Sequence, residues 1–410
     1  MGGTVVGIDV GTTKICTLVG EVDKEDHLRI VGVGVAPSRG LRKGVIVSVD
    51  EAAGAIAASI EKAERMSGYK IESAYVGVAG SHVSSLNTRG VVAIGRGDRP
   101  ITQDDVDRAM EAAQAVAVPH NRQIIHAIPR GFSVDEQEGV RDPIGLMGFR
   151  LEVEAHIVTG AITSLRNLAN CVQAAGVGIT SMILQPLASA EAVLRPDERE
   201  MGVVLVDAGG GTVDVAIFIE GSIWHSLVLP IGGNHITNDI AIGLRIPFDL
   251  AEELKRQHGH AQPETIDPDE VVEVCGSGQT PERIVSRQEL ATIIEARAEE
   301  IFELILREIK RSGYDGLLPA GLVLTGGTAD LEGLADLGQR ILKLPVRVGV
   351  PTGVEGLVDS ISGPAYATSV GLLLWGLHHD NMPERPRGRD RPRGDGYQKF
   401  MNWLKEFLPR

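Results

Sequence analysis

Two segments of the sequence each place an aspartate before a glycine-containing turn, between two apolar stretches. The first reads IDVGTTKICTLVGE from Ile8, and the second reads VDAGGGTVDVAIFIE from Val206. Glycine lets backbone amides approach a phosphate closely, and successive exposed N–H groups in such turns form an anion-binding concavity. Either turn alone is more often an ordinary β-hairpin turn, but the matched pair predicts a polyphosphate site.

The side chains in these two turns predict a cation beside the polyphosphate. Asp9 and Asp207 would repel phosphate oxygens directly, so a cation must lie between them and the phosphate. Mg²⁺, which proteins hold through waters and a few oxygens, fits that role. Lys14 adds a compact positive charge. The groups expected to contact phosphate belong to Gly11, Thr12, Thr13, Gly209, Gly210, Gly211 and Thr212.

A third segment, Leu322 to Asp330, reads LVLTGGTAD, an apolar run that ends in two glycines. After a strand, Gly326 and Gly327 would let a flat ligand lie against the backbone without side-chain obstruction. Paired glycines after a strand are often only a turn, so this segment gains meaning only beside the first two.

The composition of the chain limits its class. The formal charge of −15 argues against a general nucleic-acid binder, whose phosphate contacts need a basic face, although a local basic patch stays open. Cys16, Cys171 and Cys275 are far apart without CxxC spacing, which is typical of buried thiols in a reducing compartment. No run reaches the roughly 18 apolar residues of a spanning helix. The start has no charged and apolar leader, so we expect a mainly soluble, cytoplasmic protein.

Strands and helices alternate around the first glycine turn. A helix is expected from Val49 to Met66, with Asp50 as its N-cap. The expected strands are Thr4 to Asp9, Ile15 to Val19, Leu28 to Ala36 and Ile71 to Val78. This alternation predicts an α/β lobe with a mixed sheet.

Residues 81–160 have a different texture and are interpreted as an inserted subdomain. Its helix, Thr102 to Val116, begins with a Thr cap and an acidic first turn, as the helix dipole prefers. The expected strands are Val91 to Ile94, Gln123 to Val134 and Arg150 to Val158. The helix-then-strand pattern resumes at Ala161 and runs to Gln185.

The second glycine turn lies in a hairpin, Gly202 to Ile219, that repeats the design of the first. Such a repeat predicts two related lobes that face each other. The elements expected after it are helices at Ile236 to Ile242, Asp249 to Gln257 and Arg287 to Arg311, a strand at Gly321 to Leu324, and an apolar helix at Pro364 to Trp375.

The end of the sequence predicts a linker followed by an amphipathic helix. Residues 381–396 mix three prolines and five arginines with acids and show no apolar periodicity. A single apolar stripe then follows at helical spacing, formed by Phe400, Trp403, Leu404, Phe407 and Leu408. A helix of about twelve residues is marginal in water, so the stripe needs a partner. We expect a bilayer surface rather than the body of the protein, because a docked core helix would not need the linker.

These segments resemble, in order, the five motifs of the actin/Hsp70/sugar-kinase superfamily. The matching stretches are Ile8 to Gly20 (phosphate 1), Ile179 to Ala192 (connect 1), Val204 to Ala216 (phosphate 2), Leu322 to Leu334 (adenosine) and Ile361 to Trp375 (connect 2). The resemblance implies an α/β, actin-like, two-lobed ATPase fold with ribonuclease H-like repeats, and ATP with Mg²⁺ as its ligands. It places Asp9 and Asp207 at the hydrated Mg²⁺, and Gly326 and Gly327 beside the nucleotide. Gln185 matches the position that orients the attacking water, although a helix-start cap explains this residue equally well.

The inserted segment is similar to that of the FtsA family of bacterial cell-division proteins. The similarity lies in Val78 to Val83, in His126 to Gly160, and in the long helix that contains Glu295 and Arg297. By analogy with the superfamily, those two charged residues would lie at the ribose or adenine; paired charges along a helix face are an equally good interpretation. The second phosphate segment has Ala208 and Val213 where relatives often have a β-branched residue and a threonine, which leaves one side-chain contact open.

The resemblance implies a cell-division scaffold that forms actin-like filaments, binds membrane lipid and tethers the tubulin-like protein FtsZ. It also implies other division proteins as partners, no nucleic acid, a location at the cytoplasmic face of the membrane at the division site, and at most slow ATP hydrolysis. The predicted organisation is a first lobe (1–80 and 161–198), an inserted subdomain (81–160), a second lobe (199–238, 239–305 and 306–379), a linker (380–396) and a membrane helix (397–410). The FtsZ surface is expected within 239–305.

Three other classes of the superfamily are alternatives. A small-molecule kinase needs a carboxylate base beside the acceptor hydroxyl, and the sequence identifies none. A pilus-assembly adaptor shares the inserted subdomain but has no evident use for the linker and terminal helix. An Hsp70-type chaperone would need a substrate-binding β-domain after the second lobe.

Overall fold

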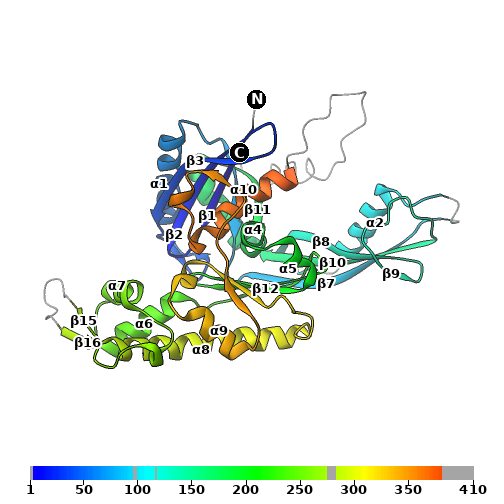
Figure 1. Ribbon diagram of the computed structural model, residues 1–410. Coiled ribbons are helices and arrows are strands. Elements are labelled where there is room, and N and C mark those ends of the chain that lie inside the picture. Colours follow the sequence, from blue (N-terminus) through cyan, green and yellow to red (C-terminus); the bar gives the residue numbers. More distant parts are fainter. Residues whose placement is uncertain (1–2, 96–98, 116–117, 275–282, 381–410) are drawn as a thin grey trace.

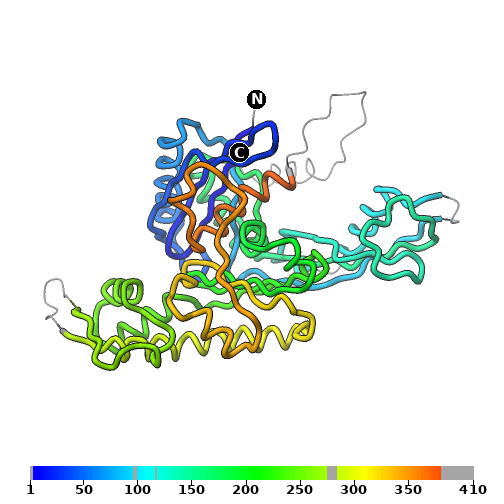
Figure 2. Tube along the Cα trace, viewed as in Figure 1, coloured from blue at the N-terminus to red at the C-terminus, as the bar shows by residue number. Residues whose placement is uncertain are grey.

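The structure, a computed structural model, describes residues 3–95, 99–115, 118–274 and 283–380. It consists of two α/β lobes, one above the other in Figure 1, and a third unit that projects to one side. The trace in Figure 2 starts in the first lobe (blue), runs out through the projecting unit (cyan) and returns to the first lobe. It then passes through the second lobe (green to yellow) and ends again in the first lobe (red). Each of the three units has its own buried apolar cluster.

The first lobe is built on a six-stranded sheet with the order β11-β6-β1-β2-β3-β19. β1 pairs antiparallel with β2 and parallel with β6, so the predicted mixed sheet is confirmed. The strands are nearly continuous apolar runs because helices cover both faces. They are β1 (Thr4–Val10), β2 (Lys14–Val22), β3 (Leu28–Pro37), β6 (Ser73–Val78), β11 (Gly178–Leu184) and β19 (Glu355–Gly356), with the small pair β4 (Leu41–Arg42) and β5 (Val45–Ile46) beside them.

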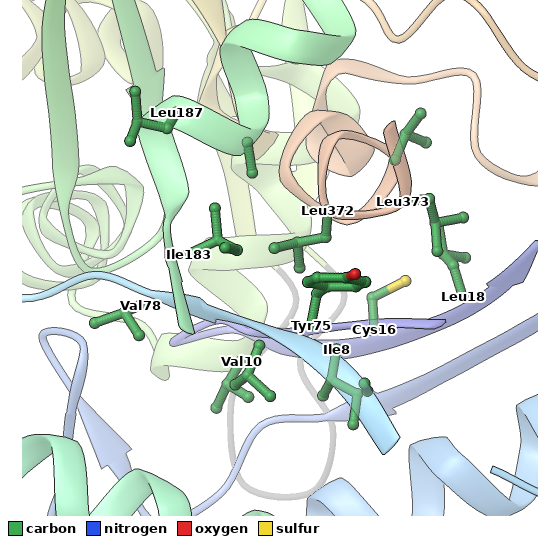
Figure 3. Packing of buried hydrophobic residues seen from close by; sticks show 14 of the residues in the cluster. Ile8, Val10, Cys16, Leu18, Tyr75, Val78, Ile183, Leu187, Leu372 and Leu373 are labelled. Carbon is green, nitrogen blue, oxygen red and sulfur yellow. The ribbon is translucent and has the colours of Figure 1, made fainter. Parts of the chain in front are cut away.

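Helices from distant parts of the chain cover this sheet. α1 (Val49–Ser67) packs on β3 and against α3 (Ile162–Ala174), while α10 (Ala367–Asp380) packs against β1 and against α4 (Gln185–Val193). Figure 3 shows Leu372 and Leu373 of α10 beside Cys16, Leu18 and Tyr75 of the sheet. A Cβ added to Gly7 would lie 2.9 Å from the Leu372 Cβ, so glycine permits this close approach.

The structure corrects the predicted N-cap of α1 and the predicted start of the last helix. It also bears on the prediction that the cysteines are buried thiols. The N-cap of α1 is Ser48, whose backbone is extended, and Asp50 lies in the first turn, where its charge faces the positive end of the helix dipole. The last helix starts with a 3₁₀ turn, η4 (Pro364–Tyr366), and α10 then extends to Asp380. Cys16 and Cys171 are buried free thiols, as expected, and Cys275 lies outside the described residues.

The projecting unit is a four-stranded antiparallel sheet with the order β7-β10-β8-β9, covered by α2 (Gln103–Gln114). The strands are β7 (Val83–Ala93), β8 (Arg122–Val134), β9 (Gln137–Val140) and β10 (Arg150–Ala161). β7 begins well before the predicted Val91, because its first half carries polar residues that give no apolar signal. At the start of α2, Asp105 accepts hydrogen bonds from the Thr102 backbone N–H (3.0 Å) and hydroxyl (2.8 Å).

The second lobe repeats the plan of the first, as the paired hairpins predicted. Its sheet has the order β14-β13-β12-β17-β18, in which β12 pairs antiparallel with β13 and parallel with β17. These strands are β12 (Val203–Ala208), β13 (Val213–Ile219), β14 (Ser222–Leu229), β17 (Leu322–Thr325) and β18 (Val346–Val348). The lobe also contains α5 (Pro196–Met201), α8 (Arg287–Ser312), η2 (Gly327–Asp330) and α9 (Leu334–Leu342), while η3 (Val358–Ser360) follows β19.

A smaller group of elements extends from the second lobe at the lower left of Figure 1. It comprises α6 (Gly233–Leu244), α7 (Phe248–His258), η1 (Pro263–Thr265), β15 (Val271–Val274) and β16 (Arg283–Ser286). None of the helices in the described ranges is both long and apolar enough to cross a membrane.

Candidate functional site

The two glycine turns lie face to face, one from each lobe. The first is closed by a hydrogen bond from the Gly11 N–H to the Lys14 carbonyl (3.1 Å), and the second by one from the Gly209 N–H to the Thr212 carbonyl (2.9 Å). A Cβ on Gly210 would lie only 2.1 Å from the Thr13 Oγ1 atom. A Cβ on Gly211 would lie 2.6 Å from the Thr12 Oγ1 atom. The structure thus brings both predicted turns together, and their contact leaves no room for side chains at Gly210 and Gly211.

Two buried carboxylates lie behind these turns. Asp9 is 7% exposed and accepts hydrogen bonds from the Gln185 Nε2 atom (3.0 Å) and the Ser369 hydroxyl (3.2 Å). Gln185 is the first residue of α4, so its side chain is directed at the carboxylate from the connecting helix between the lobes. The Gln185 side-chain amide thus binds the Asp9 carboxylate, and no side-chain hydrogen bond among the described residues caps the start of α4.

Asp207 occupies the equivalent position in the second lobe and is 8% exposed. Its Oδ2 atom accepts hydrogen bonds from the Ser189 hydroxyl (2.5 Å) and the Thr368 hydroxyl (2.9 Å). Ser189 and Thr368 belong to α4 and α10, so the same two helices hold both carboxylates. Sequence reasoning missed these hydroxyls because serine and threonine in apolar helices carry no distinctive spacing.

Asp214 is a third buried carboxylate that sequence reasoning did not single out. It is 3% exposed, accepts a hydrogen bond from the Thr212 hydroxyl (3.1 Å), and its Oδ1 atom has no hydrogen-bond partner within the described residues. Burial raises its pKa well above the usual value, and the charge of Asp207 raises it further. The available signal was an aspartate inside an otherwise apolar strand, since buried acids without partners often mark functional sites.

The electrostatics of this group fit a bound cation. Burial raises the pKa of Asp9 to about 6, an effect that Lys14 partly offsets and Asp207 reinforces. Burial also raises the pKa of Asp207. In the described parts of the chain, no three His, Cys, Asp or Glu side chains converge as direct metal ligands. Carboxylates arranged in this way suit an ion such as Mg²⁺ that keeps several of its waters.

Lys14 lies at the same place but points at an aromatic ring. Its Nζ atom is 3.2 Å from the ring centroid of Tyr366, the last residue of η4. Burial lowers the pKa of Lys14, while the negative charges around it act in the opposite direction. The lysine therefore provides the positive charge that the sequence predicted, with the aromatic ring as an unforeseen partner.

The third predicted segment adjoins the second turn. Gly326 has a φ of 85°, and a Cβ there would lie 2.4 Å from the Asp207 Oδ1 atom. Thr328 donates a hydrogen bond to the Gly209 carbonyl (3.0 Å), and Gly327 lies beside Ala365. The left-handed conformation and the close approach explain why glycine follows β17.

Glu295 and Arg297 have other partners within the second lobe. Arg297 forms ion pairs with Asp239 (2.5 Å) and with Glu300, and Glu295 pairs with Arg340 (2.5 Å). Neither of these two α8 residues hydrogen-bonds to the glycine turns in the described structure. These contacts are ion pairs between charged side chains along the surface of α8.

A second lysine near the site, Lys255 of α7, is linked to the second glycine turn through Gly233. Its ammonium donates to the Gly233 carbonyl (3.2 Å), and the Gly233 N–H donates to the Gly209 carbonyl (2.9 Å). Sequence reasoning missed Lys255 because a lysine among acids on an amphipathic helix is usually solvent-exposed. It lies instead half-buried, held by Glu252 (2.6 Å) and the Thr237 hydroxyl (2.8 Å).

Two family models match the chain. One, described as "Cell division protein FtsA", covers residues 204–371, and the other, described as "SHS2 domain inserted in FTSA", covers residues 80–159. Cell division protein FtsA of Pseudomonas aeruginosa is 44% identical, with 98% of each chain aligned. FtsA of Bacillus subtilis is 42% identical over 94% of this chain and 86% of its own length, and FtsA of Escherichia coli is 37% identical over 98% of each chain.

Solved structures with the same fold are more distant in sequence. The PilM–PilN type IV pilus biogenesis complex aligns with a TM-score of 0.65 at 15% identity, over 91% of this chain and 98% of that one. MreB5 of Spiroplasma citri bound to ADP aligns with a TM-score of 0.54 at 15% identity, over 91% and 95% of the two chains. These likenesses, together with the inserted domain, confirm the predicted actin-like fold.

Proposed function

The chain belongs to the FtsA family of cell-division proteins, and we propose that it is an ATP-binding scaffold of the division machinery. In this proposal it assembles into actin-like filaments at the cytoplasmic face of the membrane. It attaches there through its C-terminal residues and tethers FtsZ polymers to the lipid.

ATP binding is supported above all by the two glycine turns and the buried acids behind them. Asp9 and Asp207 would hold Mg²⁺ through water, and the amides and hydroxyls of Gly11 to Thr13 and Gly209 to Thr212 would hold the phosphates. At the nucleoside end, Gly326 and Gly327 would border the ligand, with Lys255 nearby. Two observations of this structure fit such a ligand. A side chain at position 210 would clash with Thr13, and the Oδ1 atom of the buried Asp214 has no hydrogen-bond partner within the described residues.

Gln185 is the residue best placed to orient a water molecule. Its amide lies at the start of α4 and donates a hydrogen bond to the carboxylate of Asp9 (3.0 Å), the residue two positions before the first glycine turn. When bound, Mg²⁺ would neutralise negative charge on the phosphates, and the chain would contribute positioning by Gln185 and its glycine amides. Asp9, the carboxylate beside Gln185, would be engaged with Mg²⁺ rather than free to act as a general base, so we expect ATP hydrolysis to be slow.

Membrane attachment is assigned to residues 397–410, which lie outside the described residues, as does most of the predicted linker 380–396. Phe400, Trp403, Leu404, Phe407 and Leu408 are the proposed lipid-facing residues. Each large apolar group contributes at most about 1.5–3 kcal/mol when fully buried, and ordering costs on the order of 1 kcal/mol per residue. One such segment is therefore a weak anchor, and many in one filament would attach firmly because later attachments become intramolecular.

The proposed FtsZ surface is supported by exposed apolar side chains on the small part of the second lobe. Ile242 is 67% exposed and Ile284 is 66% exposed, and Val271 and Phe248 are also exposed in the same group of elements. Large exposed apolar side chains such as these are candidates for a protein–protein contact, because such contacts bury apolar surface.

Vesicle co-pelleting with purified FtsZ tests this function. FtsZ polymers should pellet with anionic vesicles only when the chain and ATP with Mg²⁺ are present. Ile284→Glu should weaken this pelleting, whereas Met201→Glu, a matched change at an exposed residue of α5, should leave it unchanged. Pelleting of FtsZ to the same extent without the chain would contradict the proposal.

A further inference from the structure

The Lys14 ammonium makes an unusual contact for a lysine among carboxylates. It lies 3.2 Å from the centroid of the Tyr366 ring. The charges of Asp9, Asp330 and Asp207 all act on it, yet Lys14 forms no ion pair with any of them and donates no hydrogen bond within the described residues. The N–H donors of the ammonium that do not face the ring therefore stay available to a ligand.

The Tyr366 ring comes from the segment that also fixes the buried acids. Tyr366 ends η4 directly before α10, whose Thr368 and Ser369 donate to Asp207 and Asp9. The Tyr366 hydroxyl makes no hydrogen bond within the described residues, so its contribution comes from the ring. One short segment thus positions both carboxylates and the lysine.

We propose that Tyr366 is a positioning residue that holds the Lys14 ammonium over its ring so that the lysine donors face a bound polyphosphate. A carboxylate in the same place would occupy those donors and neutralise the charge. An aliphatic side chain would leave a half-buried ammonium without a favourable partner, whereas the negative face of the ring attracts the cation and leaves the N–H donors on the other side of the nitrogen free.

This role rests on the proposed ATP site and makes a specific prediction for binding. Tyr366→Leu should weaken Mg²⁺–ATP binding about three- to tenfold, the range expected for loss of a cation–π contact. Tyr366→Phe keeps the ring and should bind within about twofold of the unsubstituted protein. Adenosine, which has no phosphate, should bind both variants equally.

A double-substitution cycle separates positioning from general damage to the fold. Isothermal titration calorimetry with ATP and Mg²⁺ would compare Tyr366→Leu in the natural chain and in a Lys14→Met chain. If the ring acts through the lysine, Tyr366→Leu should have no further effect once Lys14 is replaced. An equal loss in both backgrounds, or an equal loss for Tyr366→Phe and Tyr366→Leu, would overturn the proposal.

Lysine NMR signals provide a second readout that does not depend on affinity. In protein labelled with ¹³C-lysine, the ε-protons of Lys14 should be shifted upfield by the ring, lose that shift in Tyr366→Leu, and keep it when ATP is added. Loss of the shift on ATP binding would show that the ring only restrains the lysine. Two outcomes distinguish this role from the proposed function. If the unsubstituted chain binds no ATP, both the proposed function and the role of Tyr366 are disproved. If Tyr366→Leu binds ATP as tightly as the unsubstituted chain, only the role of Tyr366 is disproved.

Discussion

Individual residues of the site are held at a cost in stability. Asp9, Asp207 and Asp214 are nearly inaccessible to water, and burial raises the pKa of each. Hydroxyl and amide groups from α4 and α10 offset part of this cost by donating to Asp9 and Asp207. Such an arrangement favours a positively charged ligand, since a cation would stabilise the ionised carboxylates.

Asp9 predicts a specific pH dependence of stability. Its pKa is raised from 3.8 to about 6 in the folded chain, so its ionisation destabilises the fold as pH rises from about 4 through 6. Asp9→Asn removes this loss, so its stability relative to the natural chain should improve by about 1–3 kcal/mol between pH 4 and pH 8. Denaturation without nucleotide at a series of pH values measures this difference. Asp315→Asn, at an exposed residue, should show no such trend; the same trend there, or none for Asp9→Asn, would count against the assignment.

At the scale of single residues, the sequence predicted the parts of the site that depend on local spacing. Asp9 lies in the same hairpin as the first glycine turn, and Asp207 lies in the same hairpin as the second, so the geometry within each hairpin is determined locally. The contact between the two turns follows from the repeat of this hairpin in two lobes that face each other. Lys255 and Tyr366 were not predicted, since their positions depend on how separate helices pack. Glu295 and Arg297 were placed by analogy, and the structure shows them with other charged partners.

At the scale of elements, the glycine turns explain why the lobes can meet. Gly210→Ala would place a methyl group 2.1 Å from the Thr13 Oγ1 atom, so the Thr13 side chain or the turns themselves must shift. We expect this variant to lose at least tenfold in ATP affinity while remaining folded, measured by calorimetry and circular dichroism. The matched control is Gly54→Ala, in the middle of α1 with no atom within 4 Å of the added Cβ. It should leave ATP binding unchanged and stabilise the fold by roughly 0.5–1 kcal/mol.

The inserted subdomain is fastened to the second lobe by a buried polar group. His156 of β10 is 1% exposed, and its ring nitrogens contact the Asn87 Oδ1 atom (2.7 Å) and the Ser226 hydroxyl (2.9 Å). Asn87 also donates to the Trp224 carbonyl of β14 (3.0 Å). Burial lowers the pKa of His156 to about 3, so the ring stays neutral near pH 7.

Asn87→Ala should loosen this junction. The change leaves a buried histidine nitrogen without its partner, which costs about 1–3 kcal/mol. Amide hydrogen exchange in β7 and β14 should therefore accelerate by roughly fivefold or more. Arg89→Ala, two residues along the same strand with an exposed side chain, should change exchange little, because surface ion pairs contribute at most about 1 kcal/mol. Equal effects of the two variants would contradict the role of the buried group.

The apolar pattern predicted strand boundaries well where both faces of the strand are buried. It predicted them poorly where one face carries polar side chains. β1, β12 and β17 were predicted closely because their residues are almost all buried. The first half of β7 was missed because its polar side chains bind the second lobe, so the strand does not look apolar. The helix cap at Ser48 was missed because its neighbour Asp50 is an equally good capping residue by type.

At the scale of the whole molecule, charge is divided unevenly. Residues 381–410 contain eight Lys and Arg against four Asp and Glu, a formal charge of +4 in a chain of −15. An anionic bilayer therefore attracts the C-terminal segment and repels the rest of the chain. This separation favours attachment through the C-terminal segment alone.

Vesicle binding should thus depend on one segment and on salt. Removal of residues 396–410 should abolish co-pelleting with anionic vesicles, and Trp403→Ala should weaken it severalfold by removing the largest apolar group. Asn402→Ala, the adjacent residue off the apolar stripe, should pellet normally. Higher salt should reduce pelleting, because screening weakens the attraction to anionic lipid. Unchanged pelleting of the truncated chain would disprove this mode of attachment.

The central claim is that ATP, Mg²⁺ and lipid together produce a filament of this chain. Electron microscopy of the purified full-length protein on an anionic lipid layer tests it most directly. We expect filaments when ATP and Mg²⁺ are both present, and none when either is omitted or when residues 396–410 are removed. Identical filaments without nucleotide, or no filaments with both ligands and efficient phosphorylation of an added small molecule, would contradict the account.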